Sequence, residues 1–308
     1  MASTIVWFRQ DLRLADNPAL QEGIASKLPI IPLYIDDSRE NEEAYSRPGG
    51  ATKWWLHHSL MSLDTELKKR GSRLIVRRGP PEQVLPELID EVSADRVCWN
   101  RCYEPLSIER DKGLKQTLGQ RGTEVLSRNG ALLVEPWEIQ TRTGGPYQVF
   151  SPFWRAMKEH SFPEPSSAPR KLRTPEERPH SLTIEELKLL PRIKWHAQFY
   201  ENWKPGEAGA NRELDRFLKR GIREYKEDRD RPDHTGTSRL SPHLHFGEIS
   251  PQQVWHAVCA SLGENPEKPS IGEPYLRQII WREFAIHLLY HFPRTVTEPL
   301  RGEYSRFP

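Results

Sequence analysis

The chain has 308 residues, and its 45 Lys and Arg nearly balance its 43 Asp and Glu, which leaves a formal net charge of +2. This balance excludes a strongly basic nucleic-acid coat protein and an acidic solvating tail, so any binding of a polyanion must come from a local patch. The length is typical of about two domains, and every apolar run is too short to cross a membrane.

The N-terminal part of the chain alternates short apolar segments with amphipathic ones. Candidate strands lie at residues 4–7, 30–35, 73–76, 96–99 and 124–127, and all but the last are followed by a helical stretch. Parallel strands need such crossovers, and continuously apolar strands are typical of a sheet covered on both faces. We therefore predict an α/β fold in which residues 1–130 form a doubly wound, five-stranded parallel sheet. Asp16 or Asn17 is expected to cap a helix that begins at Pro18.

The pattern changes after the last predicted strand. Residues 131–200 include a Pro- and charge-rich stretch, FPEPSSAPRKLRTPEERPHSL, which is typical of an interdomain linker. Residues 201–308 then contain three helical stretches, at 206–224, 250–262 and 273–291. Ser250, Pro251 and Gln253 form the capping-box pattern of a helix start. We predict that residues 201–308 are the first part of an all-helical domain.

The N-terminus, MASTIVWFRQDLR, has an arginine directly after its first apolar segment and no small-residue cleavage site. We expect no signal peptide and a cytoplasmic protein. Cys98, Cys102 and Cys259 form no CxxC pair, so they predict free thiols. The histidines at 57–58 and 243–245 are not spaced to share a metal on a helix, and we expect no metal site.

The first candidate ligand segment follows the first predicted strand. That strand leads into WFRQDLRLADNPAL and not into the GxGxxG turn of a dinucleotide-binding dehydrogenase. Arg9, Asp11, Arg13 and Asp16 instead place four charges at the strand end. On their own, these charges are more typical of a surface salt-bridge cluster than of a ligand site.

The second candidate combines three hydroxyls, a guanidinium and a Ser-Pro helix start within six residues. These residues are Thr237, Ser238, Arg239, Leu240, Ser241 and Pro242. Backbone amides and side chains could converge there on a phosphate. An ordinary helix start has the same pattern, so both interpretations stay open at this point.

The third candidate is a face of the helix predicted at 273–291. Gln278, Trp281 and Arg282 are related by i+3 and i+4, which would place an amide, an indole and a cation together. Such a face suits a flat, hydrogen-bonding and anionic ligand, such as an extruded nucleobase with its phosphate. The alternative is an arginine that extends to solvent beside a core tryptophan.

Taken together, these segments resemble the DNA photolyase and cryptochrome family, and in particular class I deoxyribodipyrimidine photolyases. The matching stretches follow family order along essentially the whole chain: TIVWFRQDLRLADNPAL, NRCYEP, YQVFSPFWRAM, TSRLSPHLHFGEIS and WREF. The resemblance implies an antenna-binding α/β domain joined to a helical domain that holds FAD. It also implies light-driven electron transfer from reduced FAD to a pyrimidine dimer flipped out of UV-damaged DNA.

The resemblance also implies roles for individual residues. FAD contacts are expected at Tyr225, Thr237, Ser238, Arg239, Leu240 and Ser241. Contacts with the lesion and its backbone are expected at Arg229, Gln278, Trp281 and Arg282, with Trp281 and Gln278 as the catalytic pair. Glu104 is the expected contact of an antenna chromophore, either methenyltetrahydrofolate or a deazaflavin. We expect a monomer.

Two departures from the family pattern qualify the expected function. Gln278 stands where cyclobutane-dimer photolyases usually have Glu, and relatives that act on the (6-4) lesion often have Gln there. The rest of YLRQIIWREFAIHLLYHFP favours the cyclobutane dimer. The sequence also stops at GEYSRFP, before the family's GYP and MHN elements, which predicts a truncated chain with a half-built flavin site. The alternatives to a repair enzyme are a cryptochrome-type photoreceptor and an inactive fragment that retains the antenna-binding module.

Overall fold

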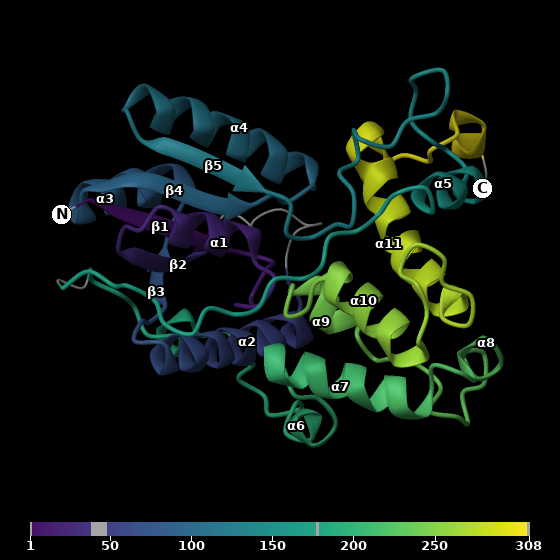
Figure 1. Cartoon of the computed structure of the whole chain (residues 1–308). Helices are drawn as coiled ribbons and strands as arrows, with labels where there is room; N and C mark the ends of the chain where they lie inside the picture. The colour runs from purple at the N-terminus through teal and green to yellow at the C-terminus, as the bar shows by residue number, and fades with distance from the viewer. Residues whose placement is uncertain (1, 38–47, 177–178, 307–308) are drawn as a thin grey trace.

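The computed structural model describes residues 2–37, 48–176 and 179–306 (Figure 1). Its N-terminal half contains a five-stranded, all-parallel sheet with the order β3-β2-β1-β4-β5. The strands are β1 (Ser3–Phe8), β2 (Ile30–Asp36), β3 (Ile75–Arg78), β4 (Ala94–Asn100) and β5 (Glu124–Arg128). All five predicted strands are confirmed, with β3 beginning two residues later than expected.

The sheet is covered on both faces, as its apolar strands predict. Val6 and Phe8 of β1 pack into a core with α1 (Pro18–Ala25) and α2 (Gly50–Lys69). Ile5 and Trp7 point to the other face, in a core with α3 (Pro81–Val92) and α4 (Pro105–Gln120). Successive side chains of a strand alternate between faces, so one apolar strand supplies both cores. The doubly wound α/β fold is confirmed.

The C-terminal half is helical and packs around its own core. Its helices are α5 (Phe150–Met157), α6 (Phe199–Asn202), α7 (Glu207–Arg220), α8 (Tyr225–Asp228), α9 (Ser241–His245), α10 (Pro251–Leu262) and α11 (Glu273–His291). Short 3-10 turns lie at Glu185–Leu187, Pro293–Val296 and Gly302–Arg306. Helix α10 begins with the predicted capping box, and α11 has the predicted limits.

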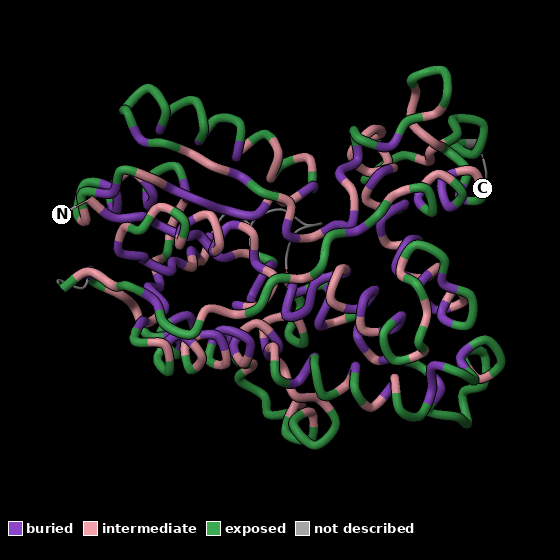
Figure 2. The backbone as a smooth tube through the Cα atoms, in the orientation of Figure 1, coloured by how far each residue is buried: buried purple, intermediate pink, exposed green. Residues whose placement is uncertain are grey.

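Residues 131–200, expected to be a linker, contribute buried side chains to both halves. Leu133, Phe150 and Phe153 belong to the helical core. Leu172 and Leu187 pack against the core of α1 and α2. Figure 2 shows buried residues at intervals along this extended segment. The segment therefore packs against both halves along much of its length. The exact domain limits stay a prediction.

The charged cluster after β1 is a buried junction and not a surface salt-bridge cluster. Arg9 Nη1 lies 2.7 Å from Asp111 Oδ2, with both side chains largely buried. Arg13 is 1% exposed, and its guanidinium donates to the carbonyls of Asp16, Gly130 and Gly247. These carbonyls come from the loop after β1, from the residue directly before the connecting segment (residues 131–200) and from the helical half.

Gly247 is required at this junction. Its φ is +62°, and a Cβ there would overlap the backbone carbonyl of Gln10. On the same side, Glu207 at the start of α7 accepts the backbone N–H groups of Leu14 and Ala15. The loop after β1 thus fixes the helical half against the carboxyl ends of the strands, toward which the strand arrows point in Figure 1.

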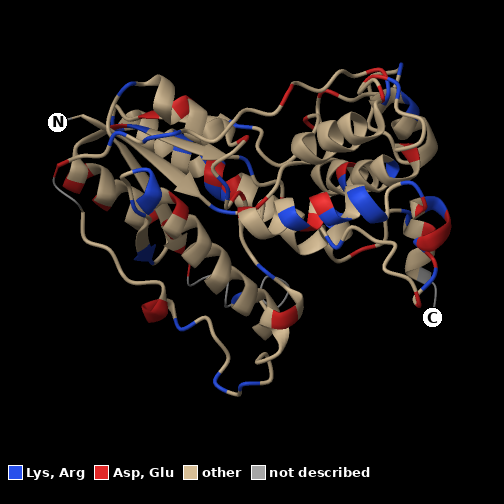
Figure 3. Cartoon of the chain, turned by 60° about the horizontal axis from the view of Figure 1, so that its bottom comes forward, with Lys and Arg blue, Asp and Glu red and all other residues tan. Residues whose placement is uncertain are grey.

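Acidic and basic residues are both scattered over the two halves (Figure 3). This distribution agrees with the near-zero net charge, so any cluster of cations is confined to a small part of the surface. Among the helices of the described residues, none is long and apolar enough to cross a membrane.

Candidate functional site

A surface cavity of about 500 Å³ lies between α8 and the first half of α11. Its lining residues are Lys226, Arg229, Asp230, Ser270, Glu273, Pro274, Arg277, Gln278 and Trp281. Arg229, Gln278 and Trp281, three of the residues expected to face a flipped base, therefore lie around one cavity. Its lining has three cations and two carboxylates, so the local charge favours an anion.

Trp281 is an exposed platform and not a core residue. Its side chain is 45% exposed, whereas Leu276 and Ile280 on the opposite face of α11 are fully buried. The indole stacks on Phe150, the first residue of α5, with ring centroids 3.6 Å apart and planes 6° apart. This parallel contact fixes the plane of the indole and leaves its other face open to a flat ligand.

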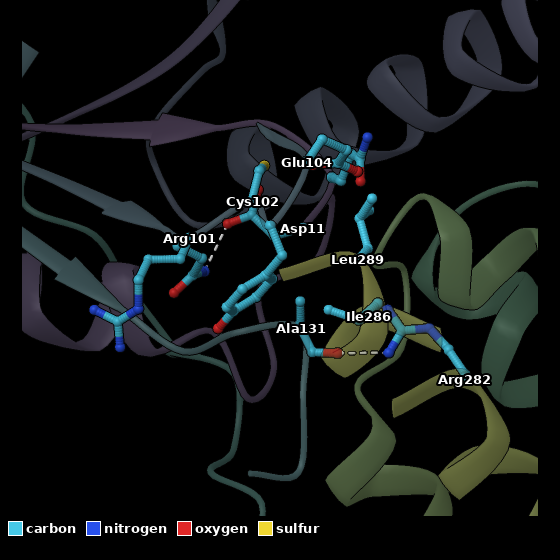
Figure 4. Close-up of a pocket in the computed structure, with 11 residues that line it drawn as sticks. Asp11, Arg101, Cys102, Glu104, Ala131, Arg282, Ile286 and Leu289 are labelled. Atoms are coloured by element: carbon cyan, nitrogen blue, oxygen red, sulfur yellow. Dashed lines mark hydrogen bonds between the residues drawn. The ribbon is translucent and has the colours of Figure 1, made fainter. Parts of the chain in front are cut away.

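Arg282 does not share this face, and the expectation that it joins Gln278 and Trp281 is wrong. Consecutive residues of an α-helix are about 100° apart, which turns Arg282 away from Trp281. Its Nη1 atom instead donates to the carbonyl oxygen of Ala131 at 2.7 Å. Figure 4 shows this contact, with Arg282 reaching from α11 to the connecting segment.

Arg282 lines a second, much smaller cavity between the two halves. The volume is about 50 Å³, and the lining residues are Gln10, Asp11, Asn100, Arg101, Cys102, Tyr103, Glu104, Ala131, Arg282, Ile286 and Leu289 (Figure 4). Glu104 is thus placed at the junction of the halves, directly before α4. Sites for small molecules usually measure about 300–1,000 Å³. The cavity in this structure is therefore too small for a pterin or a deazaflavin.

Two buried carboxyl groups stand behind the second cavity, and sequence analysis missed both. Glu283 is 3% exposed and accepts the backbone N–H of Leu133 at 2.9 Å; burial raises its pKa to about 8. Glu135 accepts the hydroxyl of Tyr103 at 2.7 Å and is ion-paired with Arg101, and burial raises its pKa as well. Glu283 follows Ile279 and Ile280 by four and three residues. Its place on the buried face of the helix could therefore have been predicted from helical spacing.

The hydroxyl-rich loop is only partly arranged as an anion site. Thr237 and Ser241 are exposed, and their hydroxyls make no hydrogen bond to any other residue that the structure describes. Arg239, at φ +57°, points elsewhere: its Cζ lies 4.1 Å from the Trp203 ring centroid, and its Nη2 donates to Asn202. The expectation that Arg239 converges with the hydroxyls is therefore not met.

Tyr225, Ser238 and Leu240 are buried and connect the loop to α11. The ring of Tyr225 lies 5.1 Å from that of Tyr275, and Ser238 lies beside the same tyrosine. Tyr275 precedes Trp281 by six residues, or about 9 Å along the helix axis. The loop thus contacts α11 at Tyr275, less than two helical turns before Trp281.

Residues 4–171 match the family model described as DNA photolyase. A deoxyribodipyrimidine photo-lyase from Agrobacterium fabrum is 45% identical over 95% of this chain and 60% of the relative. Cryptochrome-1 from Arabidopsis thaliana is 33% identical over 99% of this chain and 46% of its own length.

The fold also matches a solved structure of a bacterial class III photolyase from Agrobacterium tumefaciens. The TM-score is 0.93 with 42% identity, and the match covers 100% of this chain and 63% of the other. The chain thus spans 46 to 63% of the length of these three relatives.

Proposed function

The chain belongs to the DNA photolyase family, and from this premise we propose that it acts in the light-dependent repair of UV-damaged DNA. The single observation that carries the proposal is the Trp281 platform at a cationic surface cavity. A damaged base inside a duplex cannot reach a cofactor, so it must be flipped out and stacked in a pocket. The open face of Trp281 suits that task.

We propose a cyclobutane pyrimidine dimer as the substrate. Its two linked bases can contact the open face of Trp281, and they offer imide groups to an amide one helical turn away, at Gln278. Gln278 has an acceptor and two donors, so it can bond to both a ring N–H and a ring carbonyl. The (6-4) lesion is the alternative substrate, because the uncharged amide of Gln278 is equally compatible with that lesion.

FAD is the proposed cofactor, and the chain offers two free hydroxyls to its diphosphate. These belong to Thr237 and Ser241, with Tyr225 and Ser238 buried behind them. When bound, reduced FAD supplies an electron donor that light excites. The protein's own contribution is to hold the lesion on Trp281, orient it through Gln278 and neutralise nearby phosphates with the cavity's cations.

The residues do not fit an antenna chromophore in this structure, because the cavity beside Glu104 and Arg282 has room for about 50 Å³ only. An antenna at this place stays a prediction.

We propose class III in place of class I for the repair enzyme, since the class III photolyase of Agrobacterium tumefaciens is similar over the whole chain. A blue-light receptor of the cryptochrome type is the second candidate, supported by the plant cryptochrome at 33% identity.

The test is lesion-dependent binding and repair by the purified 308-residue chain loaded with FAD. Duplexes carrying one cyclobutane dimer, one (6-4) lesion or no damage are titrated in the dark and then illuminated with blue light. Tighter binding and loss of the cyclobutane dimer support the proposed repair. Equal binding of all three duplexes with retained FAD favours the receptor, and failure to hold FAD at all favours an inactive fragment with a half-built flavin site.

A further inference from the structure

Arg277 is a cation in the Trp281 cavity that the expected DNA contacts do not include. It lies one helical turn before Trp281, and its Cζ is 5.3 Å from the ring centroid of Phe150. Phe150 is the ring on which Trp281 stacks. Arg277, Phe150 and Trp281 therefore form one packed group at the wall of the cavity.

The other arginine of the cavity is already engaged. Arg229 Nε lies 3.2 Å from Asp230 Oδ1, and its Cζ is 5.7 Å from the ring of Tyr225. Arg277, in contrast, makes no hydrogen bond or ion pair with the residues within 2–37, 48–176 and 179–306. The Phe150 ring limits the positions that its side chain can adopt, but leaves its guanidinium N–H groups available to a ligand.

A guanidinium group presents planar paired donors that match the oxygens of a phosphate. Residues i and i+4 of a helix are neighbours, so a long side chain at 277 can reach the backbone of a nucleotide whose base lies on Trp281. The two carboxylates of the lining contact other cations: Asp230 pairs with Arg229, and Glu273 Oε2 lies 3.8 Å from Lys158 Nζ.

We propose that Arg277 binds a backbone phosphate adjacent to the flipped lesion and thereby helps to select nucleotides that have entered the cavity. The inference rests on the proposed function, since it needs a flipped nucleotide on Trp281. Intact DNA leaves the cavity empty, so Arg277 contributes to the binding of damaged duplex and not of undamaged duplex.

The experiment measures the affinity of the FAD-loaded chain for duplexes with and without one cyclobutane dimer, over a series of salt concentrations. The variants are Arg277→Gln, Arg277→Lys and, as a control that removes one charge from distant α4, Lys112→Gln. One lost phosphate contact lowers the salt slope by about 0.9. We expect Arg277→Gln to show this change and about tenfold weaker binding for damaged duplex only.

Arg277→Lys should keep the slope and lose only part of the affinity, because it retains the charge but not the paired donors. Lys112→Gln should match the parent chain. An unchanged slope and affinity in Arg277→Gln, with lesion preference intact, would overturn the role of Arg277 alone. If the parent chain shows no preference for damaged duplex, the proposed repair function fails together with this inference.

Discussion

Phe150 and Trp281 lie parallel, with ring centroids 3.6 Å apart and ring planes 6° apart. Phe150 is buried and also contacts Phe284 at 5.7 Å, whereas Trp281 is half-exposed. The pair therefore joins the start of α5 to α11, and it presents one face of the Trp281 indole to solvent. The geometry of a candidate base platform is set by a residue far away in the sequence.

Replacing Trp281 by Ala should weaken binding of damaged duplex by about 1–3 kcal/mol, the usual contribution of one stacked base. Trp281→Phe should retain much of this energy, since it keeps an aromatic face. Trp137→Ala is the control, because Trp137 is also part-exposed but lies outside the cavity. Fluorescence anisotropy with a labelled duplex gives the affinities, and equal losses in Trp281→Ala and Trp137→Ala would contradict the platform.

Phe150→Leu should weaken the same binding through Trp281 and not directly. Loss of the parallel ring removes about 0.5–1.5 kcal/mol of aromatic contact and releases the indole from its plane. A double-mutant cycle separates this effect from general destabilisation. In the Trp281→Ala background, Phe150→Leu should change the affinity much less than in the parent chain, leaving only its effect on Arg277. Additive losses would show that Phe150 acts independently of the indole.

The sheet and the limits of α11 were predictable because they depend on local signals. Five apolar segments separated by helical stretches predict parallel strands, and Asn17 accepts the N–H of Leu20 as its place before Pro18 suggests. The face shared by Gln278 and Trp281 also follows from helical spacing alone. In each case the pattern lies within a few neighbouring residues.

The contact that Arg282 makes and the burial of Arg13 were not predictable, because their partners are distant in sequence. Arg282 binds Ala131, and Arg13 binds Gly130 and Gly247. A spacing rule states which residues are neighbours on one helix, but it cannot state what the rest of the chain places opposite them. The small volume of the cavity beside Glu104 has the same origin, since it depends on how the two halves pack.

Gln278→Leu should lower the preference for damaged over undamaged duplex by about 0.5–1.5 kcal/mol, the net value of one hydrogen bond. Gln278→Glu keeps an acceptor for a ring N–H of the lesion and should bind within about threefold of the parent chain. Competition titrations against undamaged duplex measure the preference. An equal loss in both variants would mean that the lesion requires the donor of the amide and not its acceptor.

Glu283 should make the stability of the chain depend on pH. Burial raises its folded-state pKa to about 8, against an ordinary value of 4.5. Between these values the folded chain keeps a proton that the unfolded chain has lost, so the free energy of unfolding falls as pH rises. The slope is at most about 1.4 kcal/mol per pH unit.

Glu283→Gln removes this titration but keeps an oxygen that can accept the backbone N–H of Leu133. Relative to the parent chain, the variant should therefore gain stability steadily from about pH 5 to about pH 8. Urea unfolding at several pH values, followed by circular dichroism, measures the difference. Parallel stability curves for the two proteins would mean that the Glu283 carboxyl is ionised in the folded state throughout this range. In that case the buried N–H of Leu133 donates to an ionised carboxylate in the parent chain. The same N–H would then make a weaker hydrogen bond to the neutral amide of the Glu283→Gln variant.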